Sequence, residues 1–116
     1  MKYRIAVASS DGIVVNQHYG RASLFRIYDV LSNNTIQLVE IREVVPVCQG
    51  GSHDNDRLKK NIEHLLDCNY VLVSRIGQEA ATLVEQEGII PMELPGIIEE
   101  SVQKLIAYEE IQNLFA

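Results

Sequence analysis

Apolar residues change their spacing along the chain, and this change constrains the fold more than any other feature. Up to residue 44 they form short runs, and after residue 54 most of them recur every three or four residues. The run Ile5–Ala8 ends in Ser9–Gly12, which predicts a buried strand followed by a turn. Leu24–Val30 and Thr35–Val44 are rich in β-branched and aromatic residues, and Asn33–Asn34 lies between them. Because asparagine tolerates positive φ, these two segments predict an antiparallel hairpin.

Three helices and two more strands follow in the predicted order. The helices are expected over 54–66, over 77–87 and from Pro95–Gly96 onward, and the short strands over Val71–Val73 and Ile89–Ile90. Gly88 is expected to end the second helix in the left-handed conformation. The residues expected to face inward are Leu58, Ile62, Leu65 and Leu66, then Ala80, Ala81 and Val84, then Ile98, Val102, Leu105 and Ile106. A hairpin followed by βαβ units predicts an α/β fold, with a mixed sheet of about five strands and helices on both faces.

Length and charge limit the functions that are open to the chain. With 116 residues, of which 47% are apolar, the whole range 1–116 is expected to form a single domain. Residues 1–30 hold four basic and two acidic side chains, whereas residues 76–116 hold eight glutamates and one lysine. The chain lacks the basic stripe of a nucleic-acid-binding protein and the long apolar run of a membrane span. We expect a cytoplasmic protein in which Cys48 and Cys68 are reduced thiols.

The loop after the first strand contains the first candidate ligand. His18 lies among Asn16, Gln17 and Gly20, so we expect an exposed imidazole that could ligate a metal ion. Arg21 could offset the charge of an anionic ligand. Arg21→Glu should then weaken the binding of such a ligand more than Arg42→Glu does. The alternative is an ordinary histidine in a surface loop.

Two further segments could contribute to the same site. Cys48 and His53 are five positions apart, and with His18 they would supply three metal ligands if the loops meet. The alternative is a flexible connection with a free thiol. The turn Ser74–Gly77 leads into a helix, and its amides could hold an anion, although most such turns are simply turns. His64 is expected in solvent and Cys68 in the core.

The residues of these segments resemble a known family. Ile5–Ser9, Asp11–Gly12, Asn16–Gly20 and Phe25–Val30 resemble, in order and spacing, the dinitrogenase iron–molybdenum-cofactor-binding domains of the NifX, NafY and NifB C-terminal type. The resemblance implies a ribonuclease H-like, three-layer α/β/α sandwich that binds an iron–molybdenum cofactor or a precursor iron–sulfur cluster. It places the candidate cluster ligand at His18. Tyr19 stands where this family usually has phenylalanine.

Two hypotheses follow. The first is a non-catalytic protein that carries a metallocluster and exchanges it with donor or acceptor proteins. It would bind the cofactor through Asn16, His18, Tyr19, Gly20, Arg21 and Gly77, with His18, Cys48 and His53 as metal ligands. The second is a small-molecule-binding or protein-interaction module on the same fold, without a cluster. A hydrolase or nuclease is disfavoured, because the chain has no phosphate-binding loop and its acidic residues are in the wrong places to hold catalytic metal ions. We expect a monomer or a weak homo-oligomer.

Overall fold

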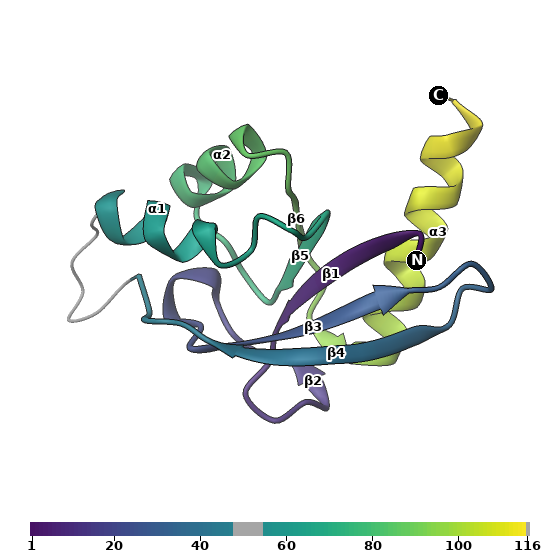
Figure 1. Cartoon of the computed structure of the whole chain (residues 1–116), viewed down its shortest axis with the longest axis horizontal. Coiled ribbons are helices and arrows are strands. Elements are labelled where there is room, and N and C mark those ends of the chain that lie inside the picture. Colours follow the sequence, from purple (N-terminus) through teal and green to yellow (C-terminus); the bar gives the residue numbers. More distant parts are fainter. Residues whose placement is uncertain (48–54, 116) are drawn as a thin grey trace.

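The computed structural model describes residues 1–47 and 55–115 (Figure 1). The strands are β1 (Tyr3–Ala8), β2 (Val14–Val15), β3 (Leu24–Val30), β4 (Ile36–Glu43), β5 (Tyr70–Val73), β6 (Ile90–Glu93) and β7 (Gly96–Ile97). The helices are the 3-10 turn η1 (Tyr19–Arg21), α1 (Asn55–Glu63), α2 (Gln78–Gln86) and α3 (Ile98–Leu114). No helix in these two ranges combines the length and the apolar character needed to cross a bilayer.

The main sheet has five strands in the order β4-β3-β1-β5-β6. β1 is central, antiparallel to β3 and parallel to β5, and β6 continues the parallel half. Ile5–Ala8 and Tyr70–Val73 are buried at every position, as expected for strands covered on both faces. The mixed five-stranded α/β sheet predicted from the sequence is therefore confirmed.

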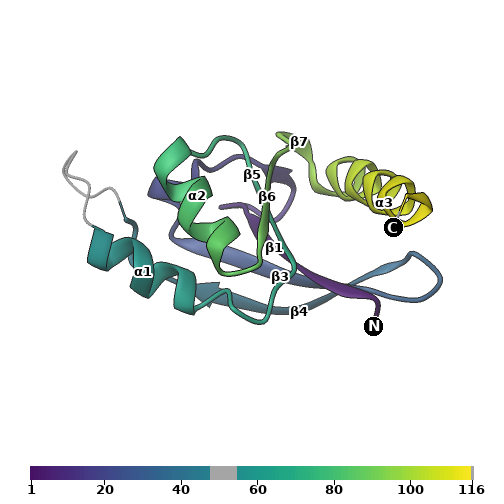
Figure 2. The same ribbon diagram turned by 90° about the horizontal axis from the view of Figure 1, so that it is seen from above.

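Two apolar cores lie on opposite faces of the sheet. On one face, α1 and α2 place Leu58, Ile62 and Val84 against Phe25 and other buried strand residues. On the other face, α3 packs its apolar stripe against a second set of residues from β1, β3 and β5. Figure 2 shows α1 and α2 on one side of the strands and α3 on the other. The protein therefore has three layers, whereas its description as ribonuclease H-like stays a prediction.

Local turn chemistry agrees with two sequence predictions. Asn34 adopts a positive φ of 65° in the turn between β3 and β4, and Gly88 has a φ of 82° after α2. Left-handed backbone is unfavourable for most side chains, so asparagine and glycine occupy these positions at little cost. The predicted hairpin and the predicted end of the second helix are confirmed.

Two details of the prediction are wrong. Pro95–Gly96 does not open the third helix, because Gly96–Ile97 forms β7 and pairs with Val14–Val15 in a small second sheet. The helix begins at Ile98, whose N–H donates to the carbonyl of Ile13 (3.0 Å). Leu66 is 51% exposed, since α1 ends at Glu63 and the turn that follows rotates this side chain away from the core.

Candidate functional site

Two loops meet beyond the carboxyl ends of β1 and β5. His18 forms an isolated parallel bridge with Arg75. The Tyr19 amide donates to the Arg75 carbonyl (2.8 Å), and the Ser74 amide donates to the Gln17 carbonyl (3.0 Å). These bonds extend the pairing of the two parallel strands into the loops. The predicted convergence of the His18 loop with the Ser74–Gly77 turn is confirmed, at the end of the sheet where α/β folds gather their ligands.

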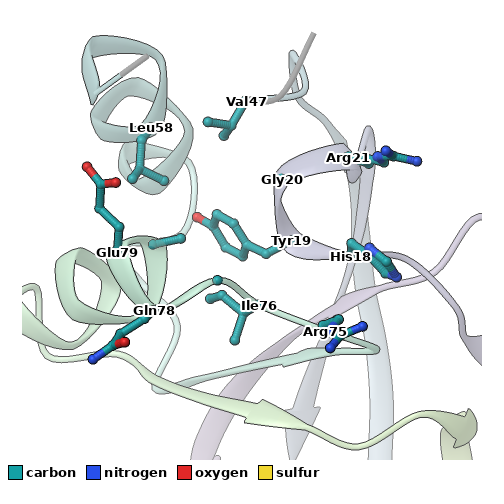
Figure 3. Close-up of a pocket in the computed structure, with 12 residues that line it drawn as sticks. His18, Tyr19, Gly20, Arg21, Val47, Leu58, Arg75, Ile76, Gln78 and Glu79 are labelled. Atoms are coloured by element: carbon teal, nitrogen blue, oxygen red, sulfur yellow. The ribbon is translucent and has the colours of Figure 1, made fainter. Parts of the chain in front are cut away.

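The two loops border a pocket of about 530 Å³ (Figure 3). Its walls come from the His18 loop, Val47 after β4, α1 and the start of α2. The lining residues are His18, Tyr19, Gly20, Arg21, Val47, Leu58, Arg75, Ile76, Gly77, Gln78, Glu79 and Ala80. The volume falls within the usual range for small-molecule and cofactor sites.

Charge is unevenly distributed around this pocket. Figure 3 shows His18, Arg21 and Arg75 gathered on one side, with Gln78 and Glu79 on the opposite side. All three side chains on the first side are exposed, and within residues 1–47 and 55–115 none of them makes an ion pair. We call His18, Arg21 and Arg75 the cationic rim. A solvated, unpaired set of this kind favours an anionic ligand.

The start of α2 adds backbone donors to the pocket. Gly77 is the N-cap residue and supplies no capping side chain, so amides of the first helical turn lack partners within the helix. A Cβ built on Gly77 would meet nothing within 4 Å, so open space lies before this backbone. The Glu79 carboxylate in the first turn partly offsets the positive end of the helix dipole.

Tyr19 is, together with Leu58, the most buried of the pocket residues. Its side chain is fully buried, and its ring lies 5.9 Å from that of Phe25, centroid to centroid. Figure 3 shows the ring pointing into the space between Leu58 and Ile76. The hydroxyl has no hydrogen-bond partner in the described part of the chain, and burial raises its pKa well above the usual value. Its neighbours in sequence are polar or glycine, so no periodicity marked Tyr19 as a core residue.

Five of the six residues predicted to bind the cofactor line this pocket, and Asn16 does not. The Asn16 amide group is bonded to Ser10, through the Ser10 N–H (3.0 Å) and Oγ (2.9 Å). Asn16 lines a smaller adjoining pocket of about 240 Å³ with Gln17, His18 and Arg21. It therefore holds the loop in shape beside the larger pocket.

The predicted three-ligand metal site is not assembled among the described residues. Cys48 and His53 lie outside them, and residues 1–47 and 55–115 contain no group of three His, Cys, Asp or Glu side chains that could hold a metal ion. Cys68 is buried, as predicted, and burial raises the pKa of its thiol to about 12. His64 is exposed, as predicted. Arg75 was not among the predicted site residues. Its position next to the end of a buried strand could have indicated that it lies at the site.

A second charged group lies where α1 leads into β5, and we call it the ion-pair network. It consists of Arg4, Asp29, Arg42 and Asp67. Arg4 donates to Asp29 (2.7 Å) and to Asp67 (2.8 Å), and two nitrogens of Arg42 each donate to Asp67 at 2.7 Å. These guanidinium groups hold the pKa of Asp67 well below its usual range. Arg42 is therefore unsuitable as the neutral control for Arg21, because reversing its charge would break this network.

Two solved structures share the fold that positions this pocket. The crystal structure of PH0822 superposes with a TM-score of 0.66 over 90% of this chain and 88% of that chain, at 23% identity. The NMR structure of TM1290 from Thermotoga gives a TM-score of 0.61 over the same shares, at 21% identity. Fold and site together define an α/β protein with a cation-rimmed pocket beyond the parallel strands.

Sequence comparison assigns the family. Residues 1–108 match the family described as dinitrogenase iron-molybdenum cofactor, and the chain belongs to it. The FeMo cofactor biosynthesis protein NifB of Frankia alni is 38% identical over 104 residues, which are 87% of this chain and 20% of that protein. Protein NifY of Azotobacter vinelandii is 31% identical over 109 residues, 90% of this chain and 43% of that protein. The chain thus spans about a fifth of the NifB protein and less than half of NifY.

Proposed function

We propose that the chain binds and carries an iron–molybdenum cofactor, or an iron–sulfur precursor of it, during nitrogenase cofactor assembly and does not catalyse a reaction. The observation that carries the proposal is the position of His18, an exposed imidazole at the mouth of a pocket, between two arginines that make no ion pair with any described residue. Family membership supplies the cargo class. An imidazole is a competent iron ligand, and guanidinium groups stabilise the negative charge of a cluster.

The donor set suits a cargo that must be released. His18 supplies one coordinating nitrogen, whereas the arginines and the open Gly77 backbone contribute charge and hydrogen bonds around the pocket. Cys48 is bonded directly to Val47, which lines the pocket, so Cys48 and His53 stay in the proposal as additional ligands. A cluster held by few protein ligands can pass to an acceptor protein by ligand exchange. The partners are therefore proteins that donate or accept the cluster, and the proposed location is the cytoplasm.

Anaerobic loading with iron and sulfide tests the ligand assignment. His18→Ala should lose most of the visible absorption of the loaded protein and most of the iron retained after gel filtration. His64→Ala is the matched control, because it removes another exposed histidine outside the pocket, and it should load like wild type. Cys48→Ala, measured in parallel, tests the thiolate. Equal loading of the His18→Ala variant and wild type would show that His18 is not the ligand.

A second candidate is a module that binds a small organic anion and no cluster. It is favoured by the apolar side chains of Val47, Leu58 and Ile76 beside the cationic rim, and by the lack of a three-ligand group in the described residues. The loading experiment separates the two functions, since such a module would retain no iron in its wild-type form.

A further inference from the structure

Tyr19 is the pocket residue whose position the proposed function does not explain. Its side chain is fully buried, and its hydroxyl finds no partner within residues 1–47 and 55–115. A buried hydroxyl without a hydrogen bond costs about 1–3 kcal/mol relative to a satisfied one. A phenyl ring would fill the same space against Phe25 without that penalty. The hydroxyl therefore points to a group that enters the pocket and accepts a hydrogen bond.

The start of α2 supplies further donors to the same pocket. Gln78, Glu79 and Ala80 form the first turn of a helix of nine residues, and all three line the pocket. Their amides precede the first amide bonded within the helix, that of Ala81, which donates to the Gly77 carbonyl (2.9 Å). Helix N-termini of this kind bind sulfate and phosphate through backbone N–H groups. Arg75, on the cationic rim, adds a full positive charge.

We propose that the α2 end of the pocket is a subsite for a small tetrahedral oxyanion of the sulfate or phosphate type, held by the first-turn amides of α2 and the Tyr19 hydroxyl. Arg75 contributes long-range attraction from the rim. This subsite adds an anion-binding role to the proposed function. Its relevance to the transport of a cluster rests on that function. Tyr19 differs from His18 in its task, since the hydroxyl donates to an oxygen and the imidazole ligates iron.

Glu79 opposes anion binding and makes the subsite tunable. Its carboxylate lies in the first turn of α2 and lines the same pocket. A negative charge at this position lowers the potential that the helix terminus offers to a second anion. Glu79→Gln should therefore increase the affinity for the oxyanion, whereas a site that depended only on the exposed arginines would respond less to this change.

Titration with sodium sulfate, and separately with sodium phosphate, tests the subsite on the apo protein. Backbone amide shifts of Gln78, Glu79 and Ala80 report binding, and sodium chloride at matched ionic strength is the control. Tyr19→Phe should bind sulfate about fivefold more weakly, the cost of one hydrogen bond, and should also melt at a higher temperature in the absence of ligand. Glu79→Gln should bind more tightly than wild type.

The outcomes separate this proposal from the proposed function. His18→Ala should lose iron while keeping most of its sulfate affinity, and Tyr19→Phe should lose sulfate affinity. The subsite is refuted if sulfate leaves the three amides unmoved, or if Tyr19→Phe binds sulfate as well as wild type does. Loss of iron loading alone, in any variant, bears on the ligand assignment of His18 and not on the oxyanion subsite.

Discussion

Where α1 leads into β5, Arg4 and Arg42 both donate to Asp67, whereas at the pocket Arg21 and Arg75 make no ion pair within the described ranges. The same kind of side chain thus has two different tasks. In the ion-pair network, the carboxylate satisfies the guanidinium groups and fixes β1, β4 and the segment before β5 against one another. At the cationic rim, solvent satisfies the guanidinium groups, which leaves their charge available to a ligand. Removing a charge from the ion-pair network should therefore lower the free energy of unfolding, whereas removing a charge from the cationic rim should lower the affinity for an anionic ligand.

The largest effect is expected at Asp67. Asp67→Asn removes the negative charge that two arginines share, and should lower the free energy of unfolding by about 2 kcal/mol, a value reduced for the partial exposure of the carboxylate. Urea denaturation followed by circular dichroism measures it. Iron loading per folded chain should not change. A variant as stable as wild type would show that the network contributes no net stability.

The pH dependence gives an independent check on the same residue. Since Asp67 has a depressed pKa in the folded protein, its stabilisation is fully present above the ordinary carboxyl pKa of about 4 and is lost as the pH falls through the folded value. The difference in stability between wild type and Asp67→Asn should therefore be constant from about pH 5 to 8 and shrink below about pH 4. A difference that grew in acid would contradict the assignment.

An intermediate effect is expected at Arg21. Arg21→Glu should reduce the retention of an anionic iron–sulfur cluster about fivefold at low salt and leave the free energy of unfolding nearly unchanged. Lys104→Glu on α3 is the matched control, since it makes the same change in charge on the opposite face of the sheet. The difference between the two variants should diminish as salt is added. Equal losses in both would indicate a general effect of net charge.

The smallest effect separates two serines. Ser101 Oγ is buried and donates to the Leu94 carbonyl (2.8 Å), whereas Ser74 Oγ, beside the site, is buried without a partner among the described residues. Ser101→Ala should lower the free energy of unfolding by about 1 kcal/mol, whereas Ser74→Ala should not lower it and should raise it slightly, because it removes a buried hydroxyl that has no partner among the described residues. Thermal denaturation of the two variants compares them directly. Equal costs would mean that the Ser74 hydroxyl is satisfied in solution.

The sequence predicts those elements of the fold whose signal is local. Ile5–Ala8 is apolar throughout because β1 is covered on both faces, and the stripe from Ile98 to Ile106 follows from the helical period of α3. The pairing of β2 with β7 was missed. It joins Val14 to Ile97 by contacts of only two residues on each strand, which are too short to show a period.

The candidate site could be predicted only in part. The motif around His18 marks one wall, because glycines and polar residues in a row indicate a loop. Arg75 reaches the same rim only through its bridge with His18, a contact between distant segments that spacing in the sequence does not reveal. The burial of Tyr19 likewise depends on packing against Phe25 and the surrounding core.

The division of the pocket between two distant segments has a consequence for the order of events during synthesis. His18 leaves the ribosome early, but Arg75 and the first turn of α2 follow only after β3, β4, α1 and β5 have been made. A nascent chain that has been made only as far as Gly77 therefore contains His18 but lacks the side of the pocket that α2 forms. Because segments are available for folding in the order in which they are translated, a two-sided pocket exists only after translation has passed α2. Loading of the proposed cargo is thus expected to follow the synthesis of α2.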